Sequence, residues 1–173
     1  MKVNSVENSS IALKSRFVPN KLLEDSFNRA YDSSDRLFLQ SVKAILNDGK
    51  NDVFELVKIQ SRIDLKQNGK TIDDNKYFTN YYGDVGCELI SKYVNKILGN
   101  YNIFCGKYQN LTADEKNIIR EKVDVIKMYS EQLGSANDYI DYVQKELNNI
   151  KTIIDENART ELQKLKQNIF GSK

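Results

Sequence analysis

The sequence predicts a predominantly helical α+β fold, with about five helices and one β-hairpin around residues 53–72. Three observations predict it. The chain of 173 residues contains one proline, Pro19, and proline is the residue that most strongly interrupts a helix. Apolar residues recur at helical spacing through most of the chain, and from Val53 the pattern changes to alternation. The length fits one domain. We expect a flexible N-terminal arm over residues 1–18 and a single globular domain over 19–173.

Two short helices are expected between Pro19 and Gly49. The first opens at Pro19-Asn20, and Ser33 or Ser34 is the candidate N-cap of the second. Gly49 suits the left-handed conformation that ends many helices. The apolar positions that define the two helices are Leu22, Leu23, Phe27, Ala30 and Tyr31, then Phe38, Val42, Ile45 and Leu46.

The hairpin prediction comes from alternation of apolar and polar residues between Val53 and Leu65. The length of this stretch indicates one long bent strand, or two strands broken near Ser61. Asn68-Gly69 follows, and this dipeptide favours the two positive φ angles of a type I′ turn. If that turn closes a hairpin, Leu65 lies opposite Ile72. Two strands alone are marginal in water, so the ribbon has to pack against helices.

A third helix is expected from Asp84 to Gly99, and a helical hairpin over residues 112–170. Thr112 and Glu115 form a capping box for the fourth helix, which we expect to end at Gly134. The last helix is about 50 Å long at 1.5 Å per residue. Its C-terminal half either packs on the N-terminal helices or pairs with a second copy. Its apolar stripe consists of Ile140, Val143, Leu147, Ile150, Ile154, Ala158, Leu162, Leu165 and Ile169.

Composition narrows the classes of function. The 26 basic and 24 acidic residues give a net charge of +2, which provides no strong field for nucleic acid or for an anionic membrane. The two cysteines are read as reduced thiols. No signal-peptide pattern and no stretch of about 20 apolar residues occurs, so we expect a cytoplasmic protein that does not bind membranes. Frequent Asn, Lys, Ile and Tyr favour a low-GC bacterial or phage gene.

Catalytic motifs are missing from the sequence. With no histidine there is no Ser-His-Asp triad and no histidine metal ligand, and no glycine-rich phosphate-binding motif occurs. We therefore expect a non-enzymatic protein that needs no cofactor and no metal. The alternative is a carboxylate site for Mg²⁺, and its residues are Asp73, Asp74, Asp84 and Glu88. The competing interpretation of the same residues is a turn, an N-cap and a solvated glutamate.

An aromatic segment over residues 76–108 contains eight of the seventeen Phe and Tyr residues. Exposed tyrosines with interleaved lysines can stack on bases and hold phosphates, so binding of single-stranded nucleic acid is an alternative function. The lysines of this alternative are Lys76, Lys92, Lys96 and Lys107. Tyrosines are equally suited to protein interfaces, and some of these rings are also core candidates.

The working hypothesis is a protein–protein interaction module, such as an adaptor, an inhibitor or an assembly subunit. Its partner is another protein or a second copy of the chain. It would act through a tyrosine-rich patch and the distal part of the last helix. The residues assigned to this contact are Tyr77, Phe78, Tyr81, Tyr82, Leu162, Leu165 and Ile169.

Overall fold

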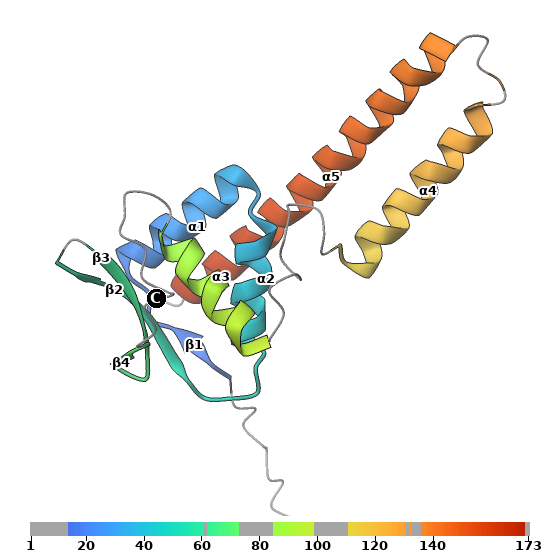
Figure 1. Ribbon diagram of the computed structural model, residues 1–173. Coiled ribbons are helices and arrows are strands. Elements are labelled where there is room, and N and C mark those ends of the chain that lie inside the picture. The colour runs from blue at the N-terminus through green and yellow to red at the C-terminus, as the bar shows by residue number, and fades with distance from the viewer. Residues whose placement is uncertain are drawn as a thin grey trace, which may run out of the picture.

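The structure is a computed structural model that describes residues 14–60, 62–72, 85–98, 111–130, 132 and 136–171. Within these residues the chain forms five helices and a small four-stranded sheet, which confirms the predicted helix-dominated α+β class. The elements in order are β1 (Arg16–Phe17), α1 (Lys21–Ser33), α2 (Arg36–Leu46), β2 (Val53–Ile59), β3 (Arg62–Gln67), β4 (Lys70–Thr71), α3 (Val85–Leu98), α4 (Ala113–Ser130) and α5 (Ala136–Phe170). In Figure 1, α1, α2, α3 and the C-terminal half of α5 lie beside the sheet, and α4 pairs with the other half of α5 away from it.

Helix α1 begins where the sequence predicts. Asn20 is its N-cap, and the Asn20 side-chain oxygen accepts a hydrogen bond from the Leu23 backbone N–H at 3.0 Å. The Asn20 amide nitrogen also donates to the Leu56 carbonyl at 2.7 Å. The same side chain therefore caps the N-terminus of α1 and holds the helix against strand β2.

Helix α2 differs from the prediction at its first turn. Its N-cap is Asp35, whose carboxylate accepts from the Phe38 N–H at 3.0 Å. Ser34 instead ends α1 in the left-handed conformation, with φ of 54°. Asp and Ser are both good N-cap residues. Because Ser34 is the C-cap of α1, the next residue, Asp35, serves as the N-cap of α2.

Strands β2, β3 and β4 form an antiparallel meander with two turns, where the sequence predicted a single hairpin. The break near Ser61 is the turn of a β2–β3 hairpin, in which Leu56 pairs with Leu65. Asn68 and Gly69 form a second turn, both with positive φ, between β3 and β4. The Ile72 N–H donates to the Leu65 carbonyl at 3.0 Å, which confirms the expected pairing of these two residues.

The end of the predicted flexible arm belongs to the folded body. Strand β1 pairs in parallel with β2, with Arg16 opposite Val53. Phe17 is buried, and the Ser15 hydroxyl donates to the Asp48 carboxylate at 2.8 Å. The boundary at residue 18 is therefore corrected for residues 14–18, because two residues are too few to show strand alternation. Residues 1–13 lie outside the described residues.

The core lies between one face of the sheet and the helices. Phe54, Leu56 and Leu65 supply the sheet side. Phe27 and Phe38 meet edge to face with their ring centroids 5.0 Å apart, an arrangement that aromatic rings favour. The helical residues of this core are Leu23, Phe27, Ala30, Phe38, Leu39, Val42, Ile45, Cys87, Leu89, Ile90, Tyr93, Val94, Ala158 and Leu162.

Candidate functional site

The most distinctive part of the described structure is a helical arm, which we define as α4 together with residues 136–153 of α5. Helix α5 has 35 residues, and only its C-terminal half reaches the core. The first half pairs with α4, and Figure 1 shows this pair projecting from the body. Two helices alone cannot enclose a core, so each keeps one side in solvent.

A buried ion pair holds the base of the arm to the body. The Arg36 guanidinium of α2 binds the Glu115 carboxylate of α4 through two hydrogen bonds. Nη1 donates to Oε1, and Nη2 donates to Oε2 at 2.6 Å. Both side chains are 5% exposed. Glu115 also completes the predicted capping box, because its Oε2 accepts from the Thr112 N–H at 2.8 Å and its own N–H donates to the Thr112 hydroxyl at 3.2 Å.

The electrostatics of Glu115 follow from this geometry. Burial alone raises the pKa of a carboxyl group. The hydrogen bond from Arg36 and the N–H of Thr112 act in the opposite direction and outweigh burial, so the pKa of Glu115 lies below its ordinary value. The carboxylate is therefore ionised at neutral pH and neutralises a guanidinium that would otherwise be buried without a counter-charge.

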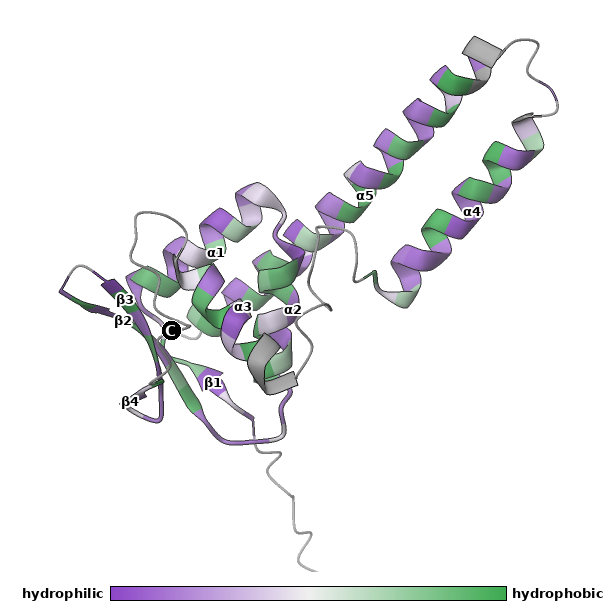
Figure 2. Cartoon of the chain, viewed as in Figure 1, coloured by the Kyte–Doolittle hydropathy of each residue, from purple (hydrophilic) through white to green (hydrophobic). Residues whose placement is uncertain are grey.

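Large apolar side chains are exposed along the arm. Among the described residues, five of the six large apolar side chains with high exposure lie on it, and the sixth is Tyr31. Figure 2 shows hydrophobic patches recurring along both helices of the arm. The five residues and their exposed fractions are Val123 39%, Met128 66%, Tyr129 45%, Ile140 60% and Leu147 51%.

The exposed residues of α5 continue the stripe that packs the core. Ile140, Leu147 and Ile154 follow one another at intervals of seven residues, so they lie near one line along the helix. Their exposed fractions are 60%, 51% and 2%. The sequence pattern predicts burial along the whole stripe, whereas Ile140 and Leu147 are exposed and Ile154, where the body begins, is buried.

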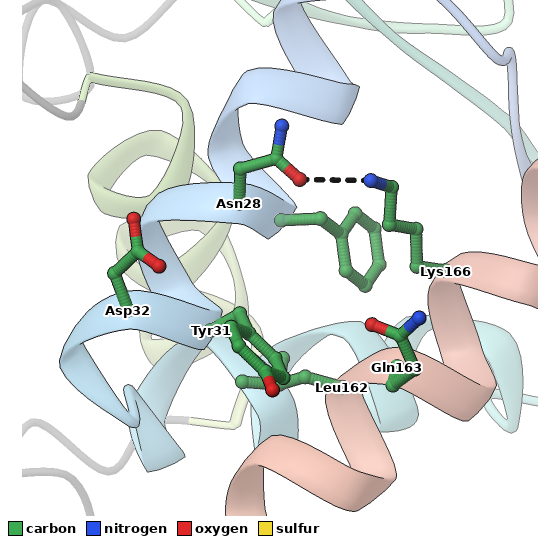
Figure 3. Close-up of a pocket in the computed structure, with 7 residues that line it drawn as sticks. Asn28, Tyr31, Asp32, Leu162, Gln163 and Lys166 are labelled. Atoms are coloured by element: carbon green, nitrogen blue, oxygen red, sulfur yellow. Dashed lines mark hydrogen bonds between the residues drawn. The ribbon is translucent and has the colours of Figure 1, made fainter.

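A concave surface lies between α1 and α5. Tyr31 and Gln163 line two adjoining cavities of about 450 and 560 Å³. Figure 3 shows the side chains of Tyr31, Asp32, Leu162 and Lys166 around the first cavity. The second is bordered by charges of both signs. It is shallow and carries no convergent set of polar groups of the kind that ligand sites use.

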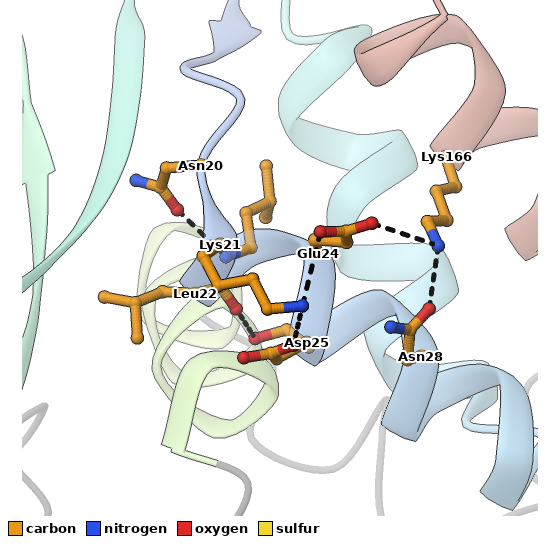
Figure 4. Close-up of polar contacts among 9 residues, drawn as sticks. Asn20, Lys21, Leu22, Glu24, Asp25, Asn28 and Lys166 are labelled. Atoms are coloured by element: carbon orange, nitrogen blue, oxygen red, sulfur yellow. Dashed lines mark hydrogen bonds and ion pairs between the residues drawn. The ribbon is translucent and has the colours of Figure 1, made fainter.

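Polar contacts across this groove tie α1 to α5. The Lys166 ammonium donates to the Asn28 side-chain oxygen at 2.8 Å and lies 3.8 Å from the Glu24 carboxylate. Figure 4 shows these contacts beside the Asn20 cap. Exposed ion pairs of this kind contribute little stability, so we interpret the groove as the seam between two packed helices.

Of the three predicted contact residues on the last helix, Leu162 is corrected. Leu162 is 1% exposed and belongs to the core, and Leu165 and Ile169 pack against that core as partly buried residues. The distal half of α5 is therefore covered by the body of the same chain. The N-terminal half of α5 is not covered by the body. It pairs with α4 on one side and contains the exposed Ile140 and Leu147.

The other predicted sites fall mostly outside the described residues. Tyr77, Phe78, Tyr81 and Tyr82 lie there, as do Lys76 and Lys107 of the nucleic-acid alternative, and Asp73, Asp74 and Asp84 of the carboxylate alternative. Lys96 belongs to α3, but its side chain is not described. Lys92 and Glu88 are partners of each other in an ion pair on α3.

The described residues lack two further kinds of feature. No described helix has the length and apolar character needed to cross a bilayer. The same residues contain no group of three or more carboxylate or cysteine side chains arranged to hold a metal ion. Comparisons of the chain with protein-family models, with curated proteins and with solved structures found no match.

Two features of the arm are not apparent from the pattern of the sequence. Arg36 and Glu115 are 79 residues apart, and no local pattern links them, although the capping box had already singled out Glu115. Ile140 and Leu147 were recognised as part of a stripe. The signal that could have placed them at a surface is the length of the last helix, which exceeds what a domain of this size covers.

Proposed function

We propose that this protein binds another protein through its helical arm and has no catalytic activity of its own. The observation that carries the proposal is the core stripe of α5 continuing onto an uncovered surface at Ile140 and Leu147. Contiguous exposed apolar surface is unfavourable in water, and in soluble proteins it marks interaction sites.

The attachment of the arm supports this function. Helix α5 runs without interruption from the arm into the core, and Arg36 holds the start of α4 at a second point. Two attachments limit the angles that the arm can take. A surface held in one orientation loses less conformational entropy when a partner binds.

The test is affinity capture from the native host with matched variants of the full chain. The arm variant carries Ile140→Glu and Leu147→Glu, which place charge on side chains that are already more than half exposed. The control variant carries Asn149→Glu and Thr152→Glu, two exposed positions of the same helix. Both add the same charge, and circular dichroism melting establishes that both are folded.

We expect a protein that is retained by the natural chain and by the control variant, and lost with the arm variant. Mixing purified components then has to reproduce the same dependence. If the arm variant retains the same proteins as the natural chain, the proposal is wrong.

A further inference from the structure

Three of the five exposed apolar residues of the arm, Val123, Ile140 and Leu147, lie on a face whose charged members are basic, and this charge indicates the chemistry of the partner. Lys122 of α4 contacts Glu146 of α5, with Nζ and Oε2 3.4 Å apart. Val123 follows Lys122 on α4, and Leu147 follows Glu146 on α5. Successive residues of a helix differ in direction by about 100° around the helix axis, so both side chains are turned by that angle from the Lys122–Glu146 contact. Because the two helices are antiparallel, equal rotations carry both side chains to the same face of the arm.

Each helix contributes one row of residues to this face, at intervals of four, three and four residues. We call the two rows together the basic face. On α4 the row surrounds Val123 with basic residues, and on α5 it contains two apolar residues, an amide and a lysine. The members of the rows are Lys116, Arg120, Val123 and Lys127 on α4, and Ile140, Gln144, Leu147 and Lys151 on α5.

Acidic residues of α4 lie on other sides of that helix. Asp114 and Glu121 are spaced by seven residues and fall on the flank opposite Val123, and Asp124 points away from α5. The ring contact of Tyr129 with Tyr142, at 5.4 Å between centroids, occupies the other face of the arm. Three of the four basic residues of α4 therefore lie on the basic face, apart from Asp114, Glu121 and Asp124, although α4 contains equal numbers of basic and acidic residues.

We propose that the basic face binds an amphipathic helix of a partner protein, whose apolar ridge is flanked by acidic residues. This inference rests on the proposed function and names the chemistry of its partner. A helix can pack along the face formed by two antiparallel helices and complete a three-helix packing. Acidic flanks on that helix lie against Lys116 and Arg120, where charge complementarity determines which partner is selected.

The same charges argue against a second copy as the occupant. Two arms that meet through the basic face in an antiparallel arrangement bring Lys and Arg side chains of one α4 against those of the other. Like charges in an interface are strongly disfavoured. A homodimer through this face therefore buries apolar surface but also brings like charges together. An acidic helix buries the same apolar surface without that repulsion.

The experiment uses the full chain and two synthetic helical peptides with the same leucine ridge. One peptide has glutamates beside the ridge and the other has lysines. Fluorescence anisotropy at low salt is expected to give about ten-fold tighter binding for the acidic peptide, a ratio set by a few exposed charge pairs. Added salt reduces the ratio because exposed charges are screened.

Charge reversal provides the matched controls. The variant with Lys116→Glu and Arg120→Glu should lose or invert the preference between the peptides. A variant with Glu121→Lys and Asp124→Lys changes two charges of the same helix away from the basic face, and it should keep the preference. Lack of binding by the acidic peptide, equal binding of the two peptides, or an unchanged preference after reversal of Lys116 and Arg120 overturns the inference.

Three further outcomes also overturn it. One is a dimer in light scattering that is absent in the arm variant. The other two are binding to phosphatidylserine vesicles, or to a single-stranded oligonucleotide, without binding to the acidic peptide. The failure of this inference is distinguishable from that of the proposed function. If a protein is captured in a way that depends on Ile140 and Leu147, but the chain shows no preference for the acidic peptide, the proposed function is supported. In that case only the inference about an acidic partner helix is wrong.

Discussion

Removing Glu115 tests how the arm is held to the body. In the Glu115→Ala variant the Arg36 guanidinium, which is 5% exposed, keeps its charge and loses its carboxylate partner. Breaking a buried pair in this way costs about 3–5 kcal/mol. The variant also loses the hydrogen bond that the Thr112 N–H donates to the Glu115 carboxylate, and a bond of this kind contributes about 1 kcal/mol. The sum is a large fraction of the 5–15 kcal/mol that stabilises a typical domain.

Urea unfolding measures this loss directly. With a slope of about 2 kcal/mol per molar urea, a loss of 4 kcal/mol moves the midpoint by about 2 M. Glu115→Gln separates the two contributions, because glutamine can still complete a capping box but carries no charge. We expect Glu115→Gln to be about 1 kcal/mol more stable than Glu115→Ala.

A double variant provides the control. Replacing both partners, as in Arg36→Met with Glu115→Leu, leaves no buried charge, and such replacements are often neutral or stabilising. We expect most of the stability lost in Glu115→Ala to return. A loss below about 1 kcal/mol for Glu115→Ala would refute the reasoning, because a loss of that size is typical of a solvent-exposed pair.

Three further predictions follow from the same structure. Gly86→Ala should lower stability by about 1–3 kcal/mol in urea unfolding, since its new methyl group would overlap Ser26 Oγ and lie 3.0 Å from a Leu56 methyl group; an unchanged midpoint would contradict this packing. Leu162→Ala should lower the free energy of unfolding by about 2–5 kcal/mol in the same measurement. Ile140→Ala, at a site 60% exposed, should lower it by less than about 1 kcal/mol. Equal decreases would contradict the difference in burial between the two residues. The depressed pKa of Glu115 gives a contribution to stability that is present above its ordinary pKa of 4.5 and is lost as pH falls through the lower folded value, so acid titration of the unfolding free energy should show a component that Glu115→Gln lacks.

Local chemistry explains which parts of the fold could be predicted. The capping box of Thr112 and Glu115 lies within one turn of helix, and Asn68-Gly69 has the φ angles of its turn encoded in the two residues themselves. Strand β1 has no comparable signal, because a two-residue strand shows no alternation. Its place beside β2 is set by burial of Phe17 and by contacts that span more than thirty residues of sequence.

The last helix shows why the candidate site could be predicted only in part. Helical periodicity identifies the residues that share one side, and it correctly grouped Ile140 and Leu147 with Ala158 and Leu162. It carries no information about which part of that side another element covers. That information lies in the tertiary contacts of α5 with α1 and α2, and it places the uncovered surface at the N-terminal half of the helix.

The ion pair at the base of the arm is better explained by orientation than by stability. Apolar residues at both positions can stabilise a fold as well as a buried pair does, so stability alone does not account for Arg36 and Glu115. Two parallel hydrogen bonds from a planar guanidinium accept only a narrow range of angles, whereas apolar side chains slide more freely. We infer that the pair fixes the direction in which the arm presents Ile140 and Leu147. The double variant with Arg36→Met and Glu115→Leu separates the two roles, because it should keep the unfolding midpoint near that of the natural chain and still bind the partner of the arm more weakly. Unchanged affinity in that variant would assign the pair to folding alone.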